Sequence, residues 1–243
     1  MTGNFFKIIT MERIMKYVVL LLPLIFVGCG IVQVSKDYTP PSKKNKIINK
    51  TVINESKDVV WKKVISNLSQ NFFVVNNLDK ESGFINVSYS GDPEEYVDGG
   101  YVHMTFSNLA GSRDYRFPGS TSSTAYTTKS EDGTVMTINR KLDLDGRINV
   151  IIVSLDSTKC QISVNIKYII NQNNTGTDVL GRTLIPYNET ISFNTGNSAT
   201  SKAGTEYCSN GNLETLILSM ANESIKITPK SDTDKASPEM INK

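Results

Sequence analysis

The sequence is poor in the residues that carry most metal and nucleophilic chemistry. Its 243 residues include one histidine, three cysteines and one tryptophan. A lone histidine cannot form a zinc site without several cysteine or carboxylate partners. The chain also contains no H-E-x-x-H motif, no G-x-S-x-G motif and no glycine-rich phosphate loop between a strand and a helix. The sequence therefore predicts no catalytic residue, no metal site and no cofactor, and we expect a protein that is not an enzyme.

An excess of charge of one sign is also missing. The formal net charge is +2, and residues 1–28 account for it with Lys7, Arg13 and Lys16 against Glu12. The remaining chain has equal numbers of basic and acidic side chains. Because nucleic-acid binders usually carry a clustered basic face, we expect no nucleic-acid partner. Charge alone would not hold such a chain on an anionic membrane either.

The apolar run Tyr17–Gly28 is too short to cross a bilayer. It has 12 residues, whereas a membrane-spanning helix needs about 20. Its length is typical of the core of a secretory signal, and Arg13 and Lys16 supply the positive flank that such a signal carries. We therefore predict a signal peptide over residues 1–28, with Met15 as a possible true start.

The apolar run ends in the sequence Ile25-Phe26-Val27-Gly28-Cys29-Gly30. This resembles the lipobox of bacterial lipoproteins, in which Gly28 and Cys29 match the two strictest positions, while Phe26 and Val27 depart from the commonest choices. The resemblance implies cleavage before Cys29, diacylglycerol on its sulfur and an acyl chain, such as palmitate, on its new amine. The family's sorting rule implies the outer membrane, because Gly30 is not Asp. The alternative is a buried core strand that happens to contain a cysteine.

Three segments follow the predicted signal. Residues 29–46 are expected to form a lipidated tether, because Pro40, Pro41 and the polar residues after them favour extended chain. Residues 47–228 are expected to form one α+β domain. Residues 229–243 are rich in Lys, Asp, Ser and Pro without an apolar period, which predicts a disordered tail.

Hydrophobic spacing predicts two helices in the domain. An apolar stripe that begins at Val60 and Trp61 predicts a helix over Lys57–Gln70, with Asn54 or Ser56 as N-cap. A second stripe predicts a helix over Asn212–Ser224. Alternating patterns predict strands over residues 47–53, 72–75, 84–89, 101–107, 115–127, 134–142, 147–156, 161–170 and 183–194, with a hairpin turn over residues 143–146. This order predicts an α+β fold in which an antiparallel sheet carries two helices packed on one face.

One segment has a more specific pattern. Trp61 lies in the first predicted helix, Asp79-Lys80-Glu81-Ser82-Gly83 forms a turn sequence, and the strand after it ends at Tyr89. This is similar to the helix-grip units of the BamC family, lipoprotein subunits of the outer-membrane barrel-assembly machinery. That family has two such units, and this chain has one clear copy, over residues 60–89. The resemblance implies a helix-grip-like fold and a cell-envelope location.

Two cysteines, Cys160 and Cys208, remain once Cys29 is lipidated. Cysteines in an oxidising envelope compartment are commonly paired, so we expect a disulfide between them, worth about 4 kcal/mol by the chain-entropy estimate. The alternative is two separate buried thiols. Neither cysteine lies in a C-x-x-C pair, which argues against a redox role.

His103 and a cluster of carboxylates between residues 92 and 98 are two further candidate sites. His103, the only histidine, lies in a predicted strand, where a structural role is favoured over a catalytic one. The carboxylates of Asp92, Glu94, Glu95 and Asp98 do not have the spacing of a calcium loop, and a solvated acidic loop explains them.

These observations favour a non-enzymatic, membrane-anchored lipoprotein with an interaction or structural role in the cell envelope. We expect contact with the membrane through lipid on Cys29, an envelope protein as partner, and a domain in the periplasm or at the cell surface. The alternative is a ligand-binding module for an apolar or lipid-like molecule. A deep apolar pocket between the Trp61 helix and the sheet would favour that alternative.

Overall fold

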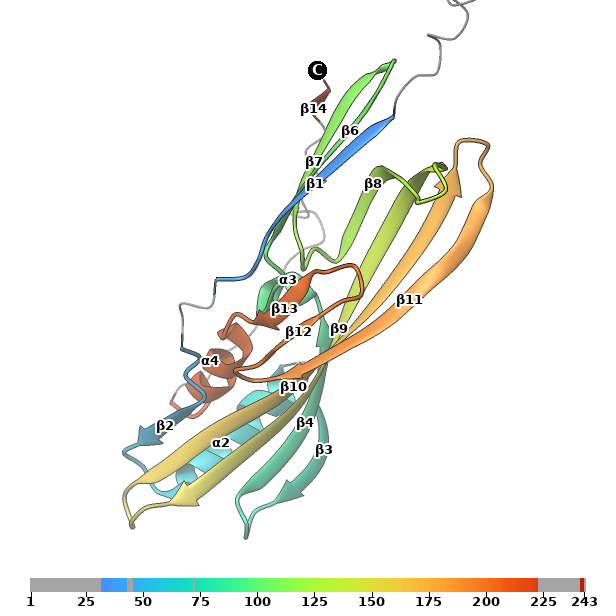
Figure 1. Cartoon of the computed structure of the whole chain (residues 1–243). Helices are drawn as coiled ribbons and strands as arrows, with labels where there is room; N and C mark the ends of the chain where they lie inside the picture. Colours follow the sequence, from blue (N-terminus) through green and yellow to red (C-terminus); the bar gives the residue numbers. More distant parts are fainter. Residues whose placement is uncertain (1–31, 43–45, 72, 223–240, 243) are drawn as a thin grey trace, which may run out of the picture.

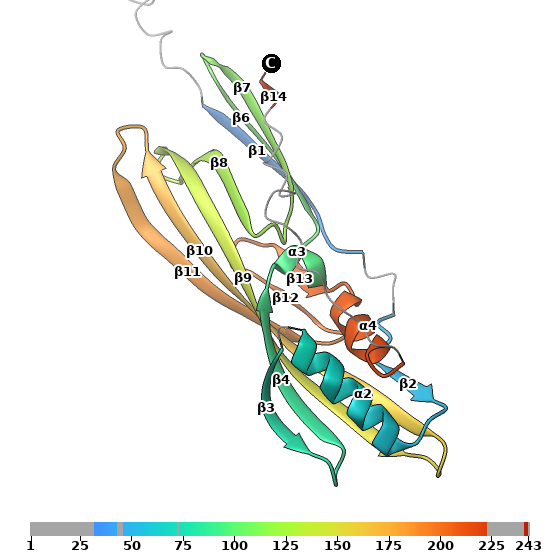
Figure 2. The ribbon, with the colours of Figure 1, turned by 180° about the vertical axis from the view of Figure 1, so that it is seen from behind.

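A computed structural model describes residues 32–42, 46–71, 73–222 and 241–242 (Figures 1 and 2). The molecule is elongated and mostly β, with 57% strand, 14% helix and three sheets. The predicted α+β fold, one antiparallel sheet with two helices on one face, is therefore wrong. The reasons lie in strands that are longer than predicted and in strands that the sequence patterns did not reveal.

The frame of the molecule is one long hairpin. Strand β9 (Val135–Ser154) has 20 residues and β10 (Cys160–Asp178) has 19, so the hairpin extends about 65 Å at about 3.3 Å per residue. Its strands alternate between exposed polar and buried apolar residues along most of their length. The buried side chains of its lower half, next to the turn, are Ile148, Val150, Ile152, Ile162, Val164 and Ile166.

This hairpin supports two different half-sheets (Figure 1). The seven-stranded sheet has the order β11-β10-β9-β4-β3, with β2 added to β10 and β8 added to β9. In the lower half, β4 pairs with residues 144–151 of β9, and in the upper half β8 pairs with residues 135–141. The flanking strands are β2 (Lys50–Ile53), β3 (Val74–Asp79), β4 (Phe84–Gly91), β8 (Ser123–Lys129) and β11 (Thr183–Asn194).

The lower half of this sheet is covered by helices α2 (Lys57–Gln70) and α4 (Asn212–Ser219) (Figure 2). Side chains of both helices and of the sheet form one buried apolar cluster, which includes Trp61 and Leu68 of α2. The buried Asn67 side chain donates a hydrogen bond to the carbonyl of Met220, at 2.9 Å, and links α2 to the chain after α4. The space between the Trp61 helix and the sheet is thus occupied by this core.

Two smaller sheets complete the upper part. A four-stranded sheet, in the order β1-β6-β7-β14, packs its inward residues, among them Phe106 and Phe117, toward Tyr126 and Val135 of the larger sheet. Its strands are β1 (Gln33–Thr39), β6 (Tyr101–Asn108), β7 (Gly111–Pro118) and β14 (Ile241–Asn242). The third sheet joins β12 (Ser198–Thr200), β13 (Glu206–Ser209) and β5 (Val97–Asp98), next to the short helix α3 (Pro93–Tyr96).

Several sequence predictions are confirmed and others are wrong. The helix over Lys57–Gln70 and the strand over Thr183–Asn194 have the predicted bounds. The second helix ends early, at Ser219. The hairpin turn over residues 143–146 is wrong, because these residues lie in the middle of β9. The alternation passes through them unbroken, with Leu144 buried and Asp145 exposed.

The predicted tether contains a strand. Residues 33–39 form β1, which pairs antiparallel with β6, so this part of the expected spacer belongs to the folded domain. The predicted signal over residues 1–28, Cys29, and residues 229–240 and 243 of the predicted tail lie outside the described residues. Within that tail, Ile241 and Asn242 pair with β7.

The structure has no disulfide between Cys160 and Cys208. Cys160 begins β10 at the lower end, eight residues before Tyr168, and this separation is roughly 26 Å along a strand. Cys208 lies next to Ser209, whose hydroxyl is 3.0 Å from that of Tyr168. The two cysteines are therefore separated by more than the roughly 7 Å between Cα atoms that a disulfide can bridge.

Candidate functional site

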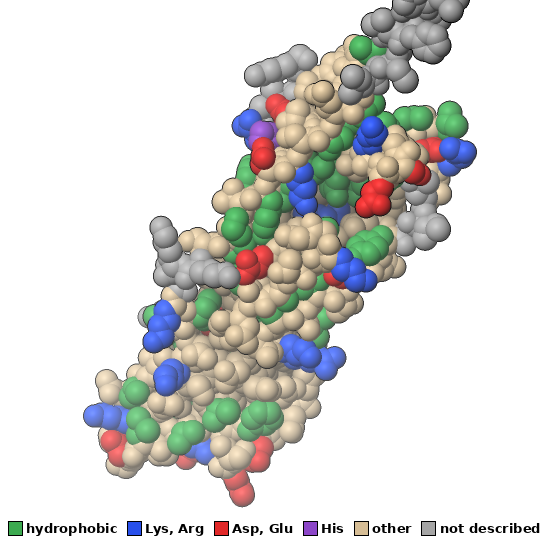
Figure 3. Space-filling view, in the orientation of Figure 1, with side chains coloured by type: hydrophobic (Ala, Val, Ile, Leu, Met, Phe, Trp, Pro, Cys, Tyr) green, Lys and Arg blue, Asp and Glu red, His purple; other side chains and the backbone are tan. Residues whose placement is uncertain are grey.

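The inward face of the long hairpin changes from apolar to polar partway along its length. In the lower half this face buries apolar side chains such as Leu144 and Ile148. In the upper half the same face carries the polar residues Arg140 of β9 and Gln172 and Asn174 of β10. These polar residues face the four-stranded sheet. We call the space between β1, β6 and β7 on one side and the upper parts of β8 to β11 on the other the inter-sheet cleft. Figure 3 shows basic and hydrophobic side chains meeting in a hollow of this region.

Three inward side chains of the cleft stand in a row across adjacent strands, which we call the polar row. Thr124 on β8 pairs with Arg140 on β9, and Arg140 pairs with Asn174 on β10. Neighbouring strands lie about 4.8 Å apart. Each residue has a buried polar atom without a hydrogen-bond partner: Thr124 Oγ1, Arg140 Nε and Asn174 Oδ1. Because buried polar atoms are nearly always hydrogen-bonded in native proteins, this row is the strongest candidate for binding a polar group.

Arg140 is the charged centre of the polar row. Its side chain is 5% exposed, its guanidinium carbon lies 5.2 Å from the centre of the Phe117 ring, and Nη2 donates to the carbonyl of Thr121 at 3.4 Å. Burial lowers the pKa of Arg140. No carboxylate in the described part of the chain lies within ion-pair distance of it. Glu94 offsets part of this charge from a distance. A buried charge without an ion pair is costly, which makes this arginine unusual as a purely structural residue.

A second cation, the exposed Lys36 of β1, lies at the edge of the cleft. It is two residues from both Val34 and Tyr38, which pack against the inward cluster of the four-stranded sheet, so it occupies the same face of β1. Its Nζ donates to the carbonyl of Ala203 at 3.2 Å. Burial and then the positive charge of Arg140 lower the pKa of Lys36. The two side chains therefore repel each other, and an anion between them would relieve that repulsion.

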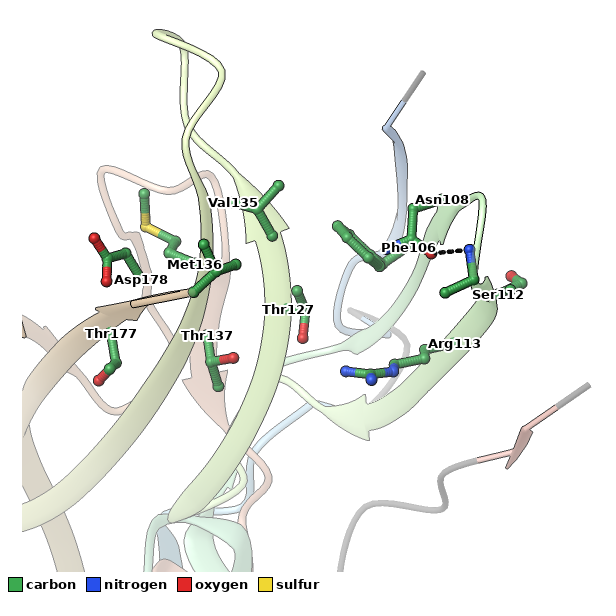
Figure 4. Close-up of a pocket in the computed structure, with 13 residues that line it drawn as sticks. Phe106, Asn108, Ser112, Arg113, Thr127, Val135, Met136, Thr137, Thr177 and Asp178 are labelled. Atoms are coloured by element: carbon green, nitrogen blue, oxygen red, sulfur yellow. Dashed lines mark hydrogen bonds between the residues drawn. The ribbon is translucent and has the colours of Figure 1, made fainter. Parts of the chain in front are cut away.

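The cleft widens into a cavity of about 400 Å³ at its upper end. Figure 4 shows Phe106 and Arg113 projecting from the β6–β7 hairpin toward Thr127 and Val135 on the opposite side. The hydroxyl of Tyr115 donates to Thr127 Oγ1 at 2.9 Å and joins the two walls below this cavity. The upper cavity thus combines an apolar wall with a third cation, Arg113.

The carboxylates around the cleft are engaged with other groups. Glu189, which pairs with Gln172, accepts from the Tyr187 hydroxyl and from the Lys202 backbone N–H, both at 2.9 Å. Glu94 accepts a hydrogen bond from the Thr121 hydroxyl.

At the mouth of the cleft, Asp178 accepts from Arg182 Nε at 2.6 Å and from the Arg182 backbone N–H at 2.9 Å. The bond from the Arg182 backbone is the largest of the effects that lower the pKa of Asp178. Of these carboxylates, Glu94 offsets part of the charge of Arg140 from a distance, but none forms an ion pair with Arg140 or Lys36 within the described structure.

Of the site residues that the sequence suggests, Glu94 lies beside this cleft, whereas His103, Asp92 and Asp98 have other surroundings. His103 is on the outward face of β6, where its Nε2 is 3.9 Å from Asp114 Oδ1. In the acidic loop, Asp92 caps α3 and Asp98 accepts from the backbone N–H of Gly100. Within the described ranges, no three His, Cys, Asp or Glu side chains gather as a metal site would require.

The sequence patterns did not lead to a prediction of the polar row, although the sequence contains a signal for it. In β10, the alternation that buries Ile166, Tyr168 and Ile170 continues into Gln172 and Asn174. An amide at a position where the period requires an apolar residue marks a polar interior. Arg140 gives the same signal in β9, but the supposed turn after it interrupted the pattern.

No family model, curated protein or solved structure matches this chain. Among the described helices, none has the length and apolar character that crossing a membrane requires.

Proposed function

We propose that this chain is a non-enzymatic lipoprotein of the bacterial cell envelope, anchored to the outer membrane by lipid on Cys29, with an interaction or structural role. Its domain lies in the periplasm or at the cell surface. The lipobox residues support the anchor. The observation that carries the structural part of the proposal is the position of β1, which begins only four residues after Cys29.

This position sets which end of the domain would face the bilayer. Gln33, the first residue of β1, pairs with Ser107, beside the turn between β6 and β7. Four residues of extended chain span at most about 14 Å. A lipid on Cys29 would therefore hold the upper end of the molecule close to the membrane, in place of the long reach that a free tether would give.

Apolar side chains at the upper end support this orientation. Leu109 in the β6–β7 turn is 84% exposed, and Val179 and Leu180 in the β10–β11 turn are 79% and 73% exposed. Each CH₂ group buried in a bilayer contributes about 0.8 kcal/mol. Arg113 and Arg182 lie near these turns and suit anionic headgroups. Shallow insertion of both turns would add to the binding that acyl chains provide.

An edge strand at the other half of the molecule supports an interaction role with a protein. Strand β3 ends the seven-stranded sheet, and all six of its residues are exposed, with Val74, Val75 and Leu78 among them. An exposed apolar edge strand can pair with a strand of another chain. We propose an extended segment of an envelope protein as the partner that adds to this edge.

The experiment that tests the anchor is the intact mass of the protein extracted from native membranes. We expect a chain that begins at Cys29 and carries the additional mass of diacylglycerol and an acyl group. An unmodified chain that begins at Met1, Met11 or Met15 would contradict the proposal.

A second candidate function, ligand binding, is favoured by the inter-sheet cleft. Its three unpartnered polar atoms, and a buried Arg140 without an ion pair among the described residues, are features that a satisfied structural core lacks. Its upper cavity, of about 400 Å³, is in the range of small-molecule sites. The cleft opens at the same end as β1 begins, so a ligand could enter from the membrane side.

A further inference from the structure

We propose that the polar row and Lys36 form a binding site for a phosphate group. This inference rests on the ligand-binding candidate and is independent of the lipid on Cys29. It identifies the chemistry of the ligand: an oxyanion that enters the inter-sheet cleft and lies between Arg140 and Lys36.

The first argument is the charge of the site. Arg140 is 5% exposed and has no carboxylate within ion-pair distance among the described residues. Lys36 contacts a carbonyl, that of Ala203, and lies close enough to Arg140 for the two charges to repel. Arginine is well suited to phosphate, because its planar guanidinium offers several N–H donors in a fixed geometry. A bound dianion would compensate both cations.

The second argument is the set of unpartnered polar atoms around Arg140. The Nε–H of Arg140 and the hydroxyl of Thr124 are donors, and the Asn174 amide offers nitrogen or oxygen depending on its rotation. These residues are adjacent in register on the inward face of three neighbouring strands. A tetrahedral oxyanion accepts several hydrogen bonds at once, and it would satisfy the Arg140 Nε–H and the Thr124 hydroxyl together, with the Asn174 amide turned so that its NH₂ group donates.

Two sources could supply such a phosphate. One is the headgroup of a phospholipid, whose acyl chains would lie toward Phe106 and Val135 in the upper cavity. The other is free phosphate or a small phosphorylated molecule. The apolar wall of the cavity would contribute to the affinity for a phospholipid but not to the affinity for free phosphate. A soluble short-chain lipid therefore distinguishes the two sources.

The test is calorimetric titration of the purified mature protein in nonionic detergent with inorganic phosphate and, separately, with dihexanoyl phosphatidic acid. The variants are Arg140→Leu and Lys36→Gln. The control is Lys167→Gln, an exposed lysine on the outward face of the same hairpin. The thermal unfolding midpoint of each unliganded variant is measured alongside.

We expect saturable binding of at least one probe by the wild type and by Lys167→Gln, and binding that is roughly tenfold or more weaker in both cleft variants. Tighter binding of the lipid would identify a headgroup site, and equal binding would identify a phosphate site. Arg140→Leu should unfold at the same temperature or higher, because it removes a buried charge that has no ion pair among the described residues.

Three results would overturn the proposal. One is the absence of saturable binding of either probe by the wild type. Another is equal binding by the wild type, Arg140→Leu and Lys36→Gln. The third is a lower unfolding midpoint for Arg140→Leu with unchanged binding by Lys36→Gln, which would make Arg140 a structural residue.

Discussion

Replacing Cys29 with alanine is expected to abolish acylation of the protein. Alanine has no sulfur to carry diacylglycerol, and signal cleavage at a lipobox depends on that modification. The variant should therefore have no lipid mass, and it should either retain residues 1–28 or appear in the soluble fraction. Membrane fractionation combined with intact mass measures both outcomes. We expect complete loss of lipid anchoring, because durable anchoring requires more than one acyl chain and the variant carries none.

A matched control for this experiment is Cys208→Ala. It removes a thiol from β13 without touching the lipobox, so it should fractionate with the wild type. If Cys29→Ala remained in the membrane fraction with the same modified mass as the wild type, Cys29 would not be the lipidated residue. The apolar run before it would then need another role.

The second large effect is expected from Gly83→Ala, in the turn between β3 and β4. Gly83 has φ +76°, and an added Cβ would lie 2.1 Å from the carbonyl oxygen of Ile152 in β9. That carbonyl belongs to a residue whose N–H donates to the Gly83 carbonyl at 2.9 Å, so the two backbones cannot easily separate. The left-handed conformation alone costs a non-glycine residue about 1–2 kcal/mol, and the steric overlap adds to this cost.

Gly146→Ala is the matched comparison. Gly146 lies in β9, and an added Cβ would meet Leu213 Cδ2 at 3.7 Å and Tyr89 Cβ at 3.8 Å, which are ordinary contacts. Because alanine is favoured over glycine inside regular structure by about 0.5–1 kcal/mol, this variant should be as stable as the wild type or slightly more stable. Chemical denaturation of both variants measures the free energies of unfolding. A large loss for Gly146→Ala would indicate that this position is a turn after all.

The two glycines also explain why the sequence predicted part of the fold and missed the rest. Asp79-Lys80-Glu81-Ser82-Gly83 and Asp143-Leu144-Asp145-Gly146 look alike as turn sequences. Only the first is a turn. In the second, Asp143 and Asp145 alternate with buried Leu142 and Leu144, which is the period of a strand.

The turn wrongly predicted at residues 143–146 changed the predicted fold class. With β9 divided in two, the sequence pattern suggested a sheet of short strands between two helices. A strand of 20 residues is longer than the usual range, so no local pattern favoured it. Strand β9 pairs with β4 in its lower half and with β8 in its upper half. Such pairing depends on residues far apart in the chain, and one sequence does not reveal it.

The candidate site was hidden for a related reason. Thr124, Arg140 and Asn174 are far apart in the chain and meet only through strand register. Lys36 reaches the same cleft because β1 joins the four-stranded sheet, whereas the prolines after it suggested a tether. The helix over Lys57–Gln70 was predictable because its apolar stripe is local, with Val60, Trp61, Val64 and Leu68 buried at helical spacing.

The central claim is that the upper end of the domain lies against the membrane to which Cys29 is anchored. The most direct measurement uses the lipidated protein in vesicles whose headgroups carry a quencher, with a fluorophore attached through Leu109→Cys or, separately, Thr158→Cys, both in the Cys208→Ala background. Leu109 is in the β6–β7 turn at the upper end of the molecule, and Thr158 is in the β9–β10 turn at the lower end of a hairpin about 65 Å long. We expect strong quenching at position 109 and none at position 158. Equal quenching at both positions, or quenching at position 158 alone, would contradict the orientation on which this account depends.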